Sequence, residues 1–466
     1  MFNKFGKDFV IYGLGIAFTK SLAIITLPIL TLYLSSSEIG TLELMTSLSS
    51  LLVLFILLGV DTGVTFFFWD KKDSPKLQSA YVSNALYTIM LSSFFVCIIL
   101  HIFKDMFLQY YFKVESLEYY HLLYFFVITQ ALFVFFTKLL RTKLLTMRYN
   151  IAILSSSISF IVFIYFFLKA NPTEGGVLFG RITSNVIVLI FFIPFIFGLL
   201  KKRVDKIIIK DLLGYSLPIM PFAIVTILLG MSDTYFINIF LGTDVLGKYT
   251  IVVKVAGIIS LVIAAFSLVY GPLAMSIKDN ANAKKIYANL YELYVFLCVF
   301  LVLLIQYFSI YLLEILVSNS ENYKEYLYLV GIVSSYAFFA NSFGQLGIGL
   351  NILKKNKYFS YFTALAFVIN VILNVLFVEM YGLAGIATAS LISIIVACSC
   401  IAFISNRYYP IKYNFSFLFS CKFILIISVF SEVFYRYNIS LELIAFLLVL
   451  GFYKLTTLSK EVKSYG

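Results

Sequence analysis

The sequence predicts an all-α, polytopic membrane protein of about fourteen transmembrane helices. Of its 466 residues, 62% are hydrophobic and only 12% are charged, about half the charged share of a typical soluble domain. The mean hydropathy is +0.99. Apolar runs of about 20 residues, long enough to cross a bilayer, recur from Phe9 to Tyr453. No stretch is left for a sizeable soluble domain.

The predicted helices are separated by short polar connections. They cover residues 9–34, 41–68, 79–103, 121–140, 150–169, 177–200, 214–240, 248–276, 289–313, 326–351, 359–378, 383–405, 416–434 and 439–453.

Lysine and arginine gather in alternate connections, and the densest group lies in residues 201–210. By the positive-inside rule, these connections and both termini are predicted to be cytoplasmic. The net charge of +12 follows from this topology, so it does not indicate binding to nucleic acid.

Two stretches of the chain repeat one pattern. Asp8-x3-Tyr12 matches Asp211-x3-Tyr215, and Leu34-x5-Gly40 matches Leu241-x5-Gly247. An even number of helices per copy makes the repeat parallel, about an axis along the membrane normal. The predicted organisation is an N-terminal six-helix lobe, a basic cytoplasmic loop, a C-terminal six-helix lobe, and two extra helices with a cytoplasmic tail. These parts cover residues 1–200, 201–210, 211–405 and 406–466.

Four Lys/Arg remain once the connections are assigned: Lys422, which begins its helix, and the three cations Lys20, Arg181 and Lys254. Lys20 lies about 21 Å from the outer end of its helix at 1.5 Å per residue, which is too deep for easy snorkelling. Charges inside a membrane mark functional sites by default, so these cations are predicted to line a substrate cavity. The structural alternatives are pairing with an acid and, for Arg181, outward snorkelling. Lys422, near the start of a helix, is predicted at the membrane interface.

The acids deepest in the predicted helices are Asp61 and Asp233, which are candidate gating or coupling groups. Asp233 and Lys254 lie at similar predicted depths on successive helices. They form either a structural ion pair or a pair that opens when an anion or a proton arrives. Asp61 is placed near the cytoplasmic end of its helix, where an interfacial role is the alternative.

Neutral polar pairs four residues apart share one helix face. Asn341 and Gln345 are predicted either to line the cavity or to join helices, whereas Asn370 and Asn374 are predicted to join helices. The five cysteines lie in or beside apolar runs and are interpreted as small hydrophobic residues. No metal site, cofactor or catalytic motif is predicted, and coupling to H⁺ or Na⁺ is left open.

Several stretches, in this order, resemble one family. They are Leu34-Ser-Ser-Ser-Glu38-Ile-Gly40, Leu140-Arg141 with Tyr149, Asp211-Leu-Leu-Gly-Tyr-Ser-Leu-Pro218-Ile-Met-Pro221, Gly247-Lys-Tyr-Thr-Ile-Val-Val-Lys254, and Tyr381-Gly-Leu-Ala-Gly385. The chain resembles, over residues 1–405, the polysaccharide-transport branch of the multidrug/oligosaccharidyl-lipid/polysaccharide (MOP) exporter superfamily. This branch includes the O-antigen, or Wzx-type, lipid-linked oligosaccharide flippases.

The resemblance implies a MATE-like bundle of two lobes that opens alternately to each side of the bacterial cytoplasmic (inner) membrane. The implied substrate is an undecaprenyl-diphosphate-linked oligosaccharide repeat unit for O-antigen, lipopolysaccharide, capsule or exopolysaccharide synthesis. Implied partners are membrane lipid and a polysaccharide polymerase with its chain-length machinery. Lys20, Arg181 and Lys254 match, by type and helix, the cations with which family members line the cavity.

Two other functions are compatible with a membrane bundle. A cation exporter of the same superfamily would be expected to present acids to its cavity, and the surplus of buried cations argues against it. A membrane glycosyltransferase or polysaccharide polymerase usually carries a long outer loop. Here the outer segment 104–120 contains Asp105, Glu115 and Glu118 but no surrounding soluble domain, so the chain is predicted to be a transporter and not an enzyme.

Overall fold

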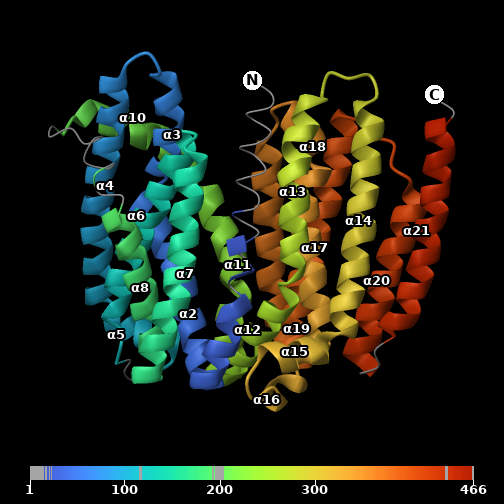
Figure 1. Ribbon diagram of the computed structural model, residues 1–466, viewed down its shortest axis with the longest axis horizontal. Coiled ribbons are helices and arrows are strands. Elements are labelled where there is room, and N and C mark those ends of the chain that lie inside the picture. The colour runs from blue at the N-terminus through green and yellow to red at the C-terminus, as the bar shows by residue number, and fades with distance from the viewer. Residues whose placement is uncertain are drawn as a thin grey trace. The chain divides into compact units, whose positions relative to one another are not determined.

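The computed structural model of the protein describes residues 15, 18–19, 21–22, 24–114, 118–191, 194, 204–435 and 439–463 (Figure 1). Within these ranges every regular element is helical, which confirms the all-α prediction. Ten described helices are individually long and apolar enough to cross a membrane, or eleven when one bent pair counts as a single span. The exact number of fourteen stays a prediction.

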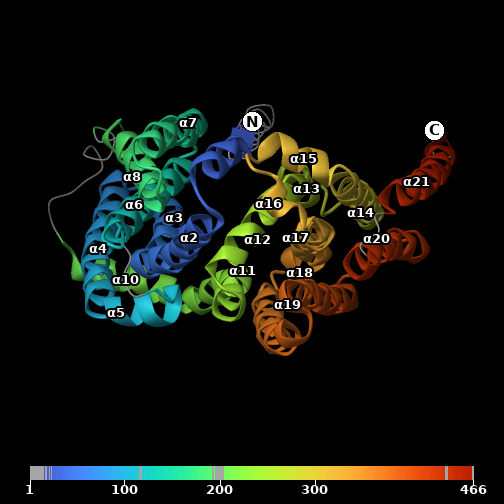
Figure 2. The ribbon, with the colours of Figure 1, turned by 90° about the horizontal axis from the view of Figure 1, so that it is seen from below.

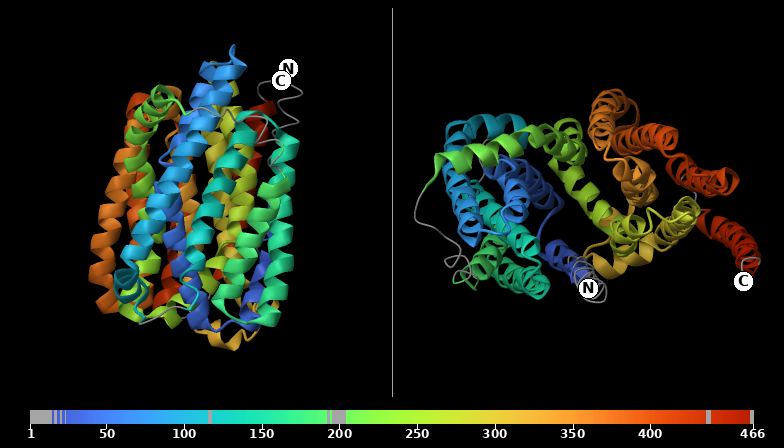
Figure 3. Two further views of the ribbon diagram at one scale, coloured as in Figure 1. Left: turned by 90° about the vertical axis from the view of Figure 1, so that its left-hand side faces the viewer. Right: turned by 90° about the horizontal axis from the view of Figure 1, so that it is seen from above.

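The helices divide into two compact units, residues Met1–Gly247 and Lys248–Gly466. The long helices of the first unit run side by side (Figure 3). They are α2 (Ser36–Leu57), α3 (Val60–Asp70), α4 (Pro75–Ile102), α6 (Leu122–Thr142), α7 (Thr146–Ala170), α8 (Glu174–Phe191) and α11 (Met220–Leu241). The shorter α10 (Lys206–Ser216) lies across the direction of these helices, against α3 and α4 (Figure 1). Short turns of helix, α5 (Lys104–Met106) and η1 (Phe107–Phe112), follow α4, and η2 (Leu217–Ile219) joins α10 to α11.

The segment after the predicted lobe boundary packs within the first unit. Helix α10 contacts α3 and α4, and α11 contacts α2. Contacts therefore divide the chain at Gly247, whereas the predicted boundary in the loop 201–210 follows the sequence repeat. That boundary stays a prediction.

The second predicted helix, residues 41–68, is wrong as a continuous element. Helix α2 ends at Leu57, and Leu58 and Gly59 both have positive φ angles, 47° and 70°. The left-handed backbone stops the i→i−4 hydrogen bonding, and α3 begins anew at Val60. Asp61 consequently lies in the first turn of a new helix rather than near the end of an old one.

The second unit contains the remaining long helices. They are α13 (Ile259–Ser276), α14 (Ala283–Tyr307), α17 (Val330–Leu346), α19 (Lys357–Tyr408), α20 (Phe415–Tyr435) and α21 (Ser440–Lys463). Shorter elements are α15 (Ser309–Leu316), α16 (Glu321–Lys324), η3 (Leu327–Leu329) and α18 (Ile348–Ile352). Helix α12 (Thr243–Ala256) leads into this unit, and α19 is broken at Gly382 (φ 55°, ψ −129°) into two arms near the predicted helices 359–378 and 383–405.

The last two helices attach to α14, and α20 and α21 lie on the opposite side of the second unit from α12 (Figure 2). The attachment is polar at two points. Near the start of α20 the backbone N–H of Asn414 donates to Oε1 of the buried Glu292 at 2.7 Å. Further along, the hydroxyl of Ser428 donates to Oε1 of Gln306 at 2.7 Å, and the Gln306 amide also donates to Glu432.

The two glycines of the sequence repeat meet in the structure. A Cβ atom on Gly40 would overlap the carbonyl oxygen of Thr243, and one on Gly247 would overlap the carbonyl oxygen of Ser36. The contact is reciprocal, because Ser36 and Gly40 occupy the same repeat positions as Thr243 and Gly247. Only a residue without a side chain allows the first turns of α2 and α12 to approach this closely.

We predict that Gly40→Ala and Gly247→Ala each destabilise the fold by about 1–3 kcal/mol, because the added methyl must displace a backbone carbonyl. Thermal unfolding of the detergent-purified protein measures the effect. Gly230→Ala is the matched control, since nothing lies within 4 Å of a Cβ placed there in α11. Unfolding of Gly40→Ala at the wild-type temperature would contradict the close contact.

Candidate functional site

Arg181 is an exposed cation on an otherwise buried face of α8. Ser184, Asn185 and Val188, at the helical spacings that share its face, are buried, yet the side chain of Arg181 is exposed. The guanidinium lies over the ring of Phe160 on α7, 3.7 Å from its Cζ to the ring centroid. The contact with Phe160 joins Arg181 to α7 of its own unit, and its side chain remains exposed.

The face around Arg181 is held by neutral hydrogen bonds. The amide of Asn185 donates to Oε1 of Gln130 on α6 at 2.9 Å, and the hydroxyl of Ser184 donates to the carbonyl of Arg181 at 2.8 Å. The described contact of the guanidinium is with an aromatic face, which attracts a cation without neutralising it. Arg181 therefore keeps its charge available for an anion.

Asp61 forms an ion pair that the sequence did not reveal. Nζ of Lys138, on α6, lies 2.6 Å from Oδ2 of Asp61, with the side chains 31% and 13% exposed. The same ammonium group donates to the hydroxyl of Thr62 at 2.7 Å. The topology prediction counts Lys138 with the charges of the connection that follows the predicted helix 121–140, whereas the structure places it within α6, one turn before its end. The pair joins α6 to α3 beside the break at Leu58–Gly59.

Asp233 and Lys254 are both half-buried. Asp233 lies on α11 in the first unit, and Lys254 lies on α12 in the second, so the pairing of the two stays a prediction. Lys20 lies outside the described residues, and its role is likewise a prediction.

Lys254 lies immediately before a helix break. Helix α12 ends at Ala256, and α13 leaves at an angle of 50° to it. At the break the backbone changes to i→i−3 hydrogen bonds, such as Ser260 N–H to the Gly257 carbonyl at 2.9 Å. Broken membrane helices place backbone polar groups and charges at binding sites in transporters.

Asn341 and Gln345 line a pocket of about 370 Å³ between α13 and α17. Gln345 is buried, and neither its amide nitrogen nor its amide oxygen has a hydrogen-bond partner among the described residues. Asn341 is exposed, and its amide donates to the carbonyl of Ala337 at 2.9 Å. A primary amide both donates and accepts, so this pocket suits a ligand rich in hydroxyl groups.

Asn370 and Asn374 have the joining role that their spacing predicted. Both are buried. The Asn370 amide donates to the hydroxyl of Ser390 at 2.8 Å, and the Asn374 amide donates to Asn370 at 3.0 Å. The bond from Asn370 to Ser390 joins the two arms of α19, and the bond from Asn374 to Asn370 lies within the first arm.

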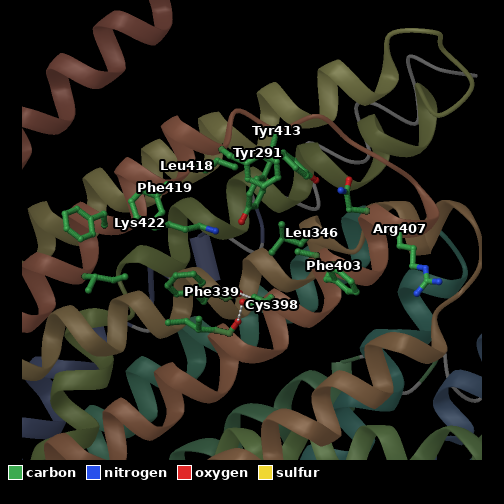
Figure 4. Close-up of a pocket in the computed structure, with 17 residues that line it drawn as sticks. Tyr291, Phe339, Leu346, Cys398, Phe403, Arg407, Tyr413, Leu418, Phe419 and Lys422 are labelled. Carbon is green, nitrogen blue, oxygen red and sulfur yellow. Dashed lines mark hydrogen bonds between the residues drawn. The ribbon is translucent and has the colours of Figure 1, made fainter.

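Lys422 lies two turns inside α20, in the wall of a pocket of about 910 Å³ (Figure 4). Helix α20 begins at Phe415, one residue from the predicted start, and the interfacial placement of Lys422 stays a prediction.

Comparison with known proteins agrees with this architecture. The family described as "Polysaccharide biosynthesis protein" matches residues 5–278. No curated protein matches the chain.

Solved structures of similar fold are transporters and a flippase. "Lipid II flippase MurJ, inward closed conformation" is 12% identical, with a TM-score of 0.72, covering 96% of this chain and 99% of that one. An inward-facing multidrug resistance MATE family transporter of the MOP superfamily is 14% identical, with a TM-score of 0.67, covering 84% and 94%. A MOP superfamily transporter from Pyrococcus furiosus is 13% identical, with a TM-score of 0.56, covering 86% and 96%. These likenesses show that the chain has the MOP-type transporter fold.

The pair of Asp61 and Lys138 should behave as a coupled unit. We predict that Lys138→Met lowers the free energy of unfolding by about 1–2 kcal/mol, because it leaves a largely buried carboxylate without its cation. The double variant Asp61→Asn/Lys138→Met should recover part of this loss, as measured by a double-mutant cycle of thermal unfolding. The exposed pair of Asp70 and Lys71 is the control, with an expected coupling under about 1 kcal/mol. Additive effects at Asp61 and Lys138 would contradict the interaction.

Proposed function

The chain belongs to the polysaccharide biosynthesis protein family, and we propose that within it this protein is a lipid-linked oligosaccharide flippase. Its substrate would be an undecaprenyl-diphosphate-linked repeat unit for O-antigen, capsule or exopolysaccharide. The protein would move it across the cytoplasmic membrane by alternating access. Three observations support the proposal: the family match, the MOP-type fold, and the chemistry of the charged and polar side chains.

The observation that carries the proposal is Arg181. A diphosphate carries negative charge that must cross a medium in which a bare charge costs several kcal/mol or more. An exposed guanidinium on an otherwise buried helix face, lying on Phe160, can replace part of the hydration of that charge. Its planar fork of donors also matches the oxygen atoms of phosphate.

The oligosaccharide requires neutral polar groups as well as cations. Asn341 and Gln345 provide amides in one pocket of the second unit, and the unsatisfied amide of Gln345 has capacity to bind sugar hydroxyls. A buried amide without a partner is unfavourable by about 1–3 kcal/mol, so a hydroxyl-bearing ligand would relieve that cost. We assign the sugar part of the substrate to this pocket.

Lys20 and Lys254 complete the proposed cation set. Lys254 would approach the headgroup beside the bend between α12 and α13, where a change of bend angle moves its charge. Asp233 would form an ion pair with Lys254 when no substrate is bound.

A cation exporter is the second candidate, because MATE transporters share the fold. Such a protein needs an accessible acid to bind its substrate. Asp61, one of the two acids predicted inside helices, is already neutralised by Lys138 at 2.6 Å. The accessible charge on α8 is a cation, which favours an anionic substrate.

We predict that Arg181→Gln lowers the rate of translocation at least tenfold, because a charge-assisted phosphate contact is lost. Radiolabelled sugar is supplied to cells lacking the gene, and the leaflet on which the lipid-linked repeat unit accumulates is determined. Wild type should clear the cytoplasmic leaflet and Arg181→Gln should not. Lys169→Gln, at the exposed end of α7, is the matched control. Accumulation only on the outer leaflet in the knockout would place the step after translocation and overturn the proposal.

Gln345→Leu should weaken transport about tenfold while leaving the protein at least as stable as wild type, because it removes a buried amide that has no described partner. The measurement compares the rate at which wild type and variant transport two substrates, a full repeat unit and a lipid carrier that bears one sugar. A larger loss for the full unit is expected, and an equal loss for both would refute a sugar site at this pocket.

A further inference from the structure

A second, larger pocket lies in the same unit, away from Asn341 and Gln345. It has a volume of about 910 Å³, at the upper end of the range for small-ligand sites. Its walls come from α14, α17, α19 and α20, and Figure 4 shows Lys422 reaching from α20 toward Tyr291 on α14. Most lining side chains are aromatic or aliphatic, while Asn406, Arg407 and Lys422 add polar groups.

The pocket is framed by the two polar attachments of α20. The bond from Asn414 to Glu292 fixes the start of this helix on α14, and the bond from Ser428 to Gln306 fixes it again nearly four turns later. Lys422 lies between these two points. The space beside it is therefore a consequence of how α20 is held.

Lys422 has aromatic neighbours and no described carboxylate as a partner. Its Nζ lies 5.9 Å from the ring centroid of Tyr291 and 5.8 Å from that of Phe339. Cation–π contacts of this length only partly offset the cost of removing an ammonium group from water. The hydroxyl of Tyr291 is buried without a hydrogen-bond partner among the described residues. An anion with acceptor oxygens would satisfy both groups.

The remaining walls of the pocket are apolar and could contact a hydrocarbon chain. A further cavity of about 280 Å³ shares Phe339, Ile395 and Ile426 with it and continues between α17, α19 and α20 with almost wholly apolar walls. On the open side, Phe403, Phe415 and Phe419 are each 70% exposed. Aromatic side chains this exposed on a membrane helix are expected to face acyl chains, so the pocket opens to lipid and a water-soluble anion would enter it poorly.

We propose that this pocket binds an anionic phospholipid of the bilayer. The phosphate would lie beside the ammonium group of Lys422 and the hydroxyl of Tyr291 (Figure 4), with an acyl chain along the apolar cavity. Basic pockets between helices on the cytoplasmic side bind anionic lipid headgroups in this way, and the charge bias of the connections predicts that this end is cytoplasmic. The lipid would hold α20 against α17 and α19. The proposal does not depend on the transported substrate.

The test uses the full-length protein, delipidated in a neutral detergent and titrated with phosphatidylglycerol or with phosphatidylcholine of the same chains. Native mass spectrometry counts bound lipid, and thermal unfolding reports the stabilisation. We expect wild type to bind phosphatidylglycerol at least fivefold more tightly than phosphatidylcholine. Lys422→Met should remove most of that difference, and Lys422→Arg should keep it. Lys412→Met is the control, because Lys412 is an exposed lysine at the same end of the unit that does not line the pocket.

Equal binding of the two phospholipids by wild type would overturn the proposal, as would undiminished selectivity in Lys422→Met. Tyr291→Phe removes only the buried hydroxyl and tests the site even if Lys422→Met folds poorly: it should weaken binding of phosphatidylglycerol, and unchanged binding would overturn the proposal as well. Displacement of phosphatidylglycerol by a polyprenyl diphosphate at tenfold lower concentration would instead identify the pocket as a carrier site.

Discussion

The close approach of Gly40 and Gly247 is the constraint on which the described helices of the first unit depend. A capping box fixes the start of α2: the backbone N–H of Ser35 donates to Glu38 at 2.8 Å, and the Glu38 N–H contacts the Ser35 hydroxyl at 3.3 Å. With its first turn fixed, the helix presents the Ser36 carbonyl and Gly40 to the first turn of α12, where Thr243 and Gly247 repeat the arrangement. Since both contacts are to backbone, neither turn can shift without opening the other contact.

Breaks in the helices place charges in the protein interior. Asp61 follows the left-handed pair Leu58–Gly59 and lies at the positive end of α3, while Lys254 precedes the 50° bend into α13. A continuous helix satisfies its backbone groups except in its first and last turns, whereas a break within the membrane leaves further groups for ligands or side chains. The two lobes predicted from the repeat thus each carry a charged residue beside a break, although the backbone geometry of the breaks differs.

Much of the fold could be predicted from the sequence because membrane helices are long, apolar and bounded by charged connections. Apolar length does not report a break such as Leu58–Gly59, because a helix and a broken helix can have the same composition. The site was harder to predict for a different reason. Lys138 looked like a loop residue because it lies near the end of α6, and only the lateral packing of α3 against α6 brings it to Asp61.

The described cations inside the helices differ in what neutralises them, and this difference separates their roles. Lys138 is neutralised by Asp61, so it contributes to packing of the first unit. Arg181 lies on Phe160 and remains exposed, which suits a ligand that arrives and leaves. Lys422 is enclosed by aromatic rings between two fixed points of α20, which suits a ligand that stays. The headgroup proposed to bind at Arg181 must exchange readily, because a transported substrate is released on the far side of the membrane. The phospholipid proposed at Lys422 is not transported, so it can exchange slowly.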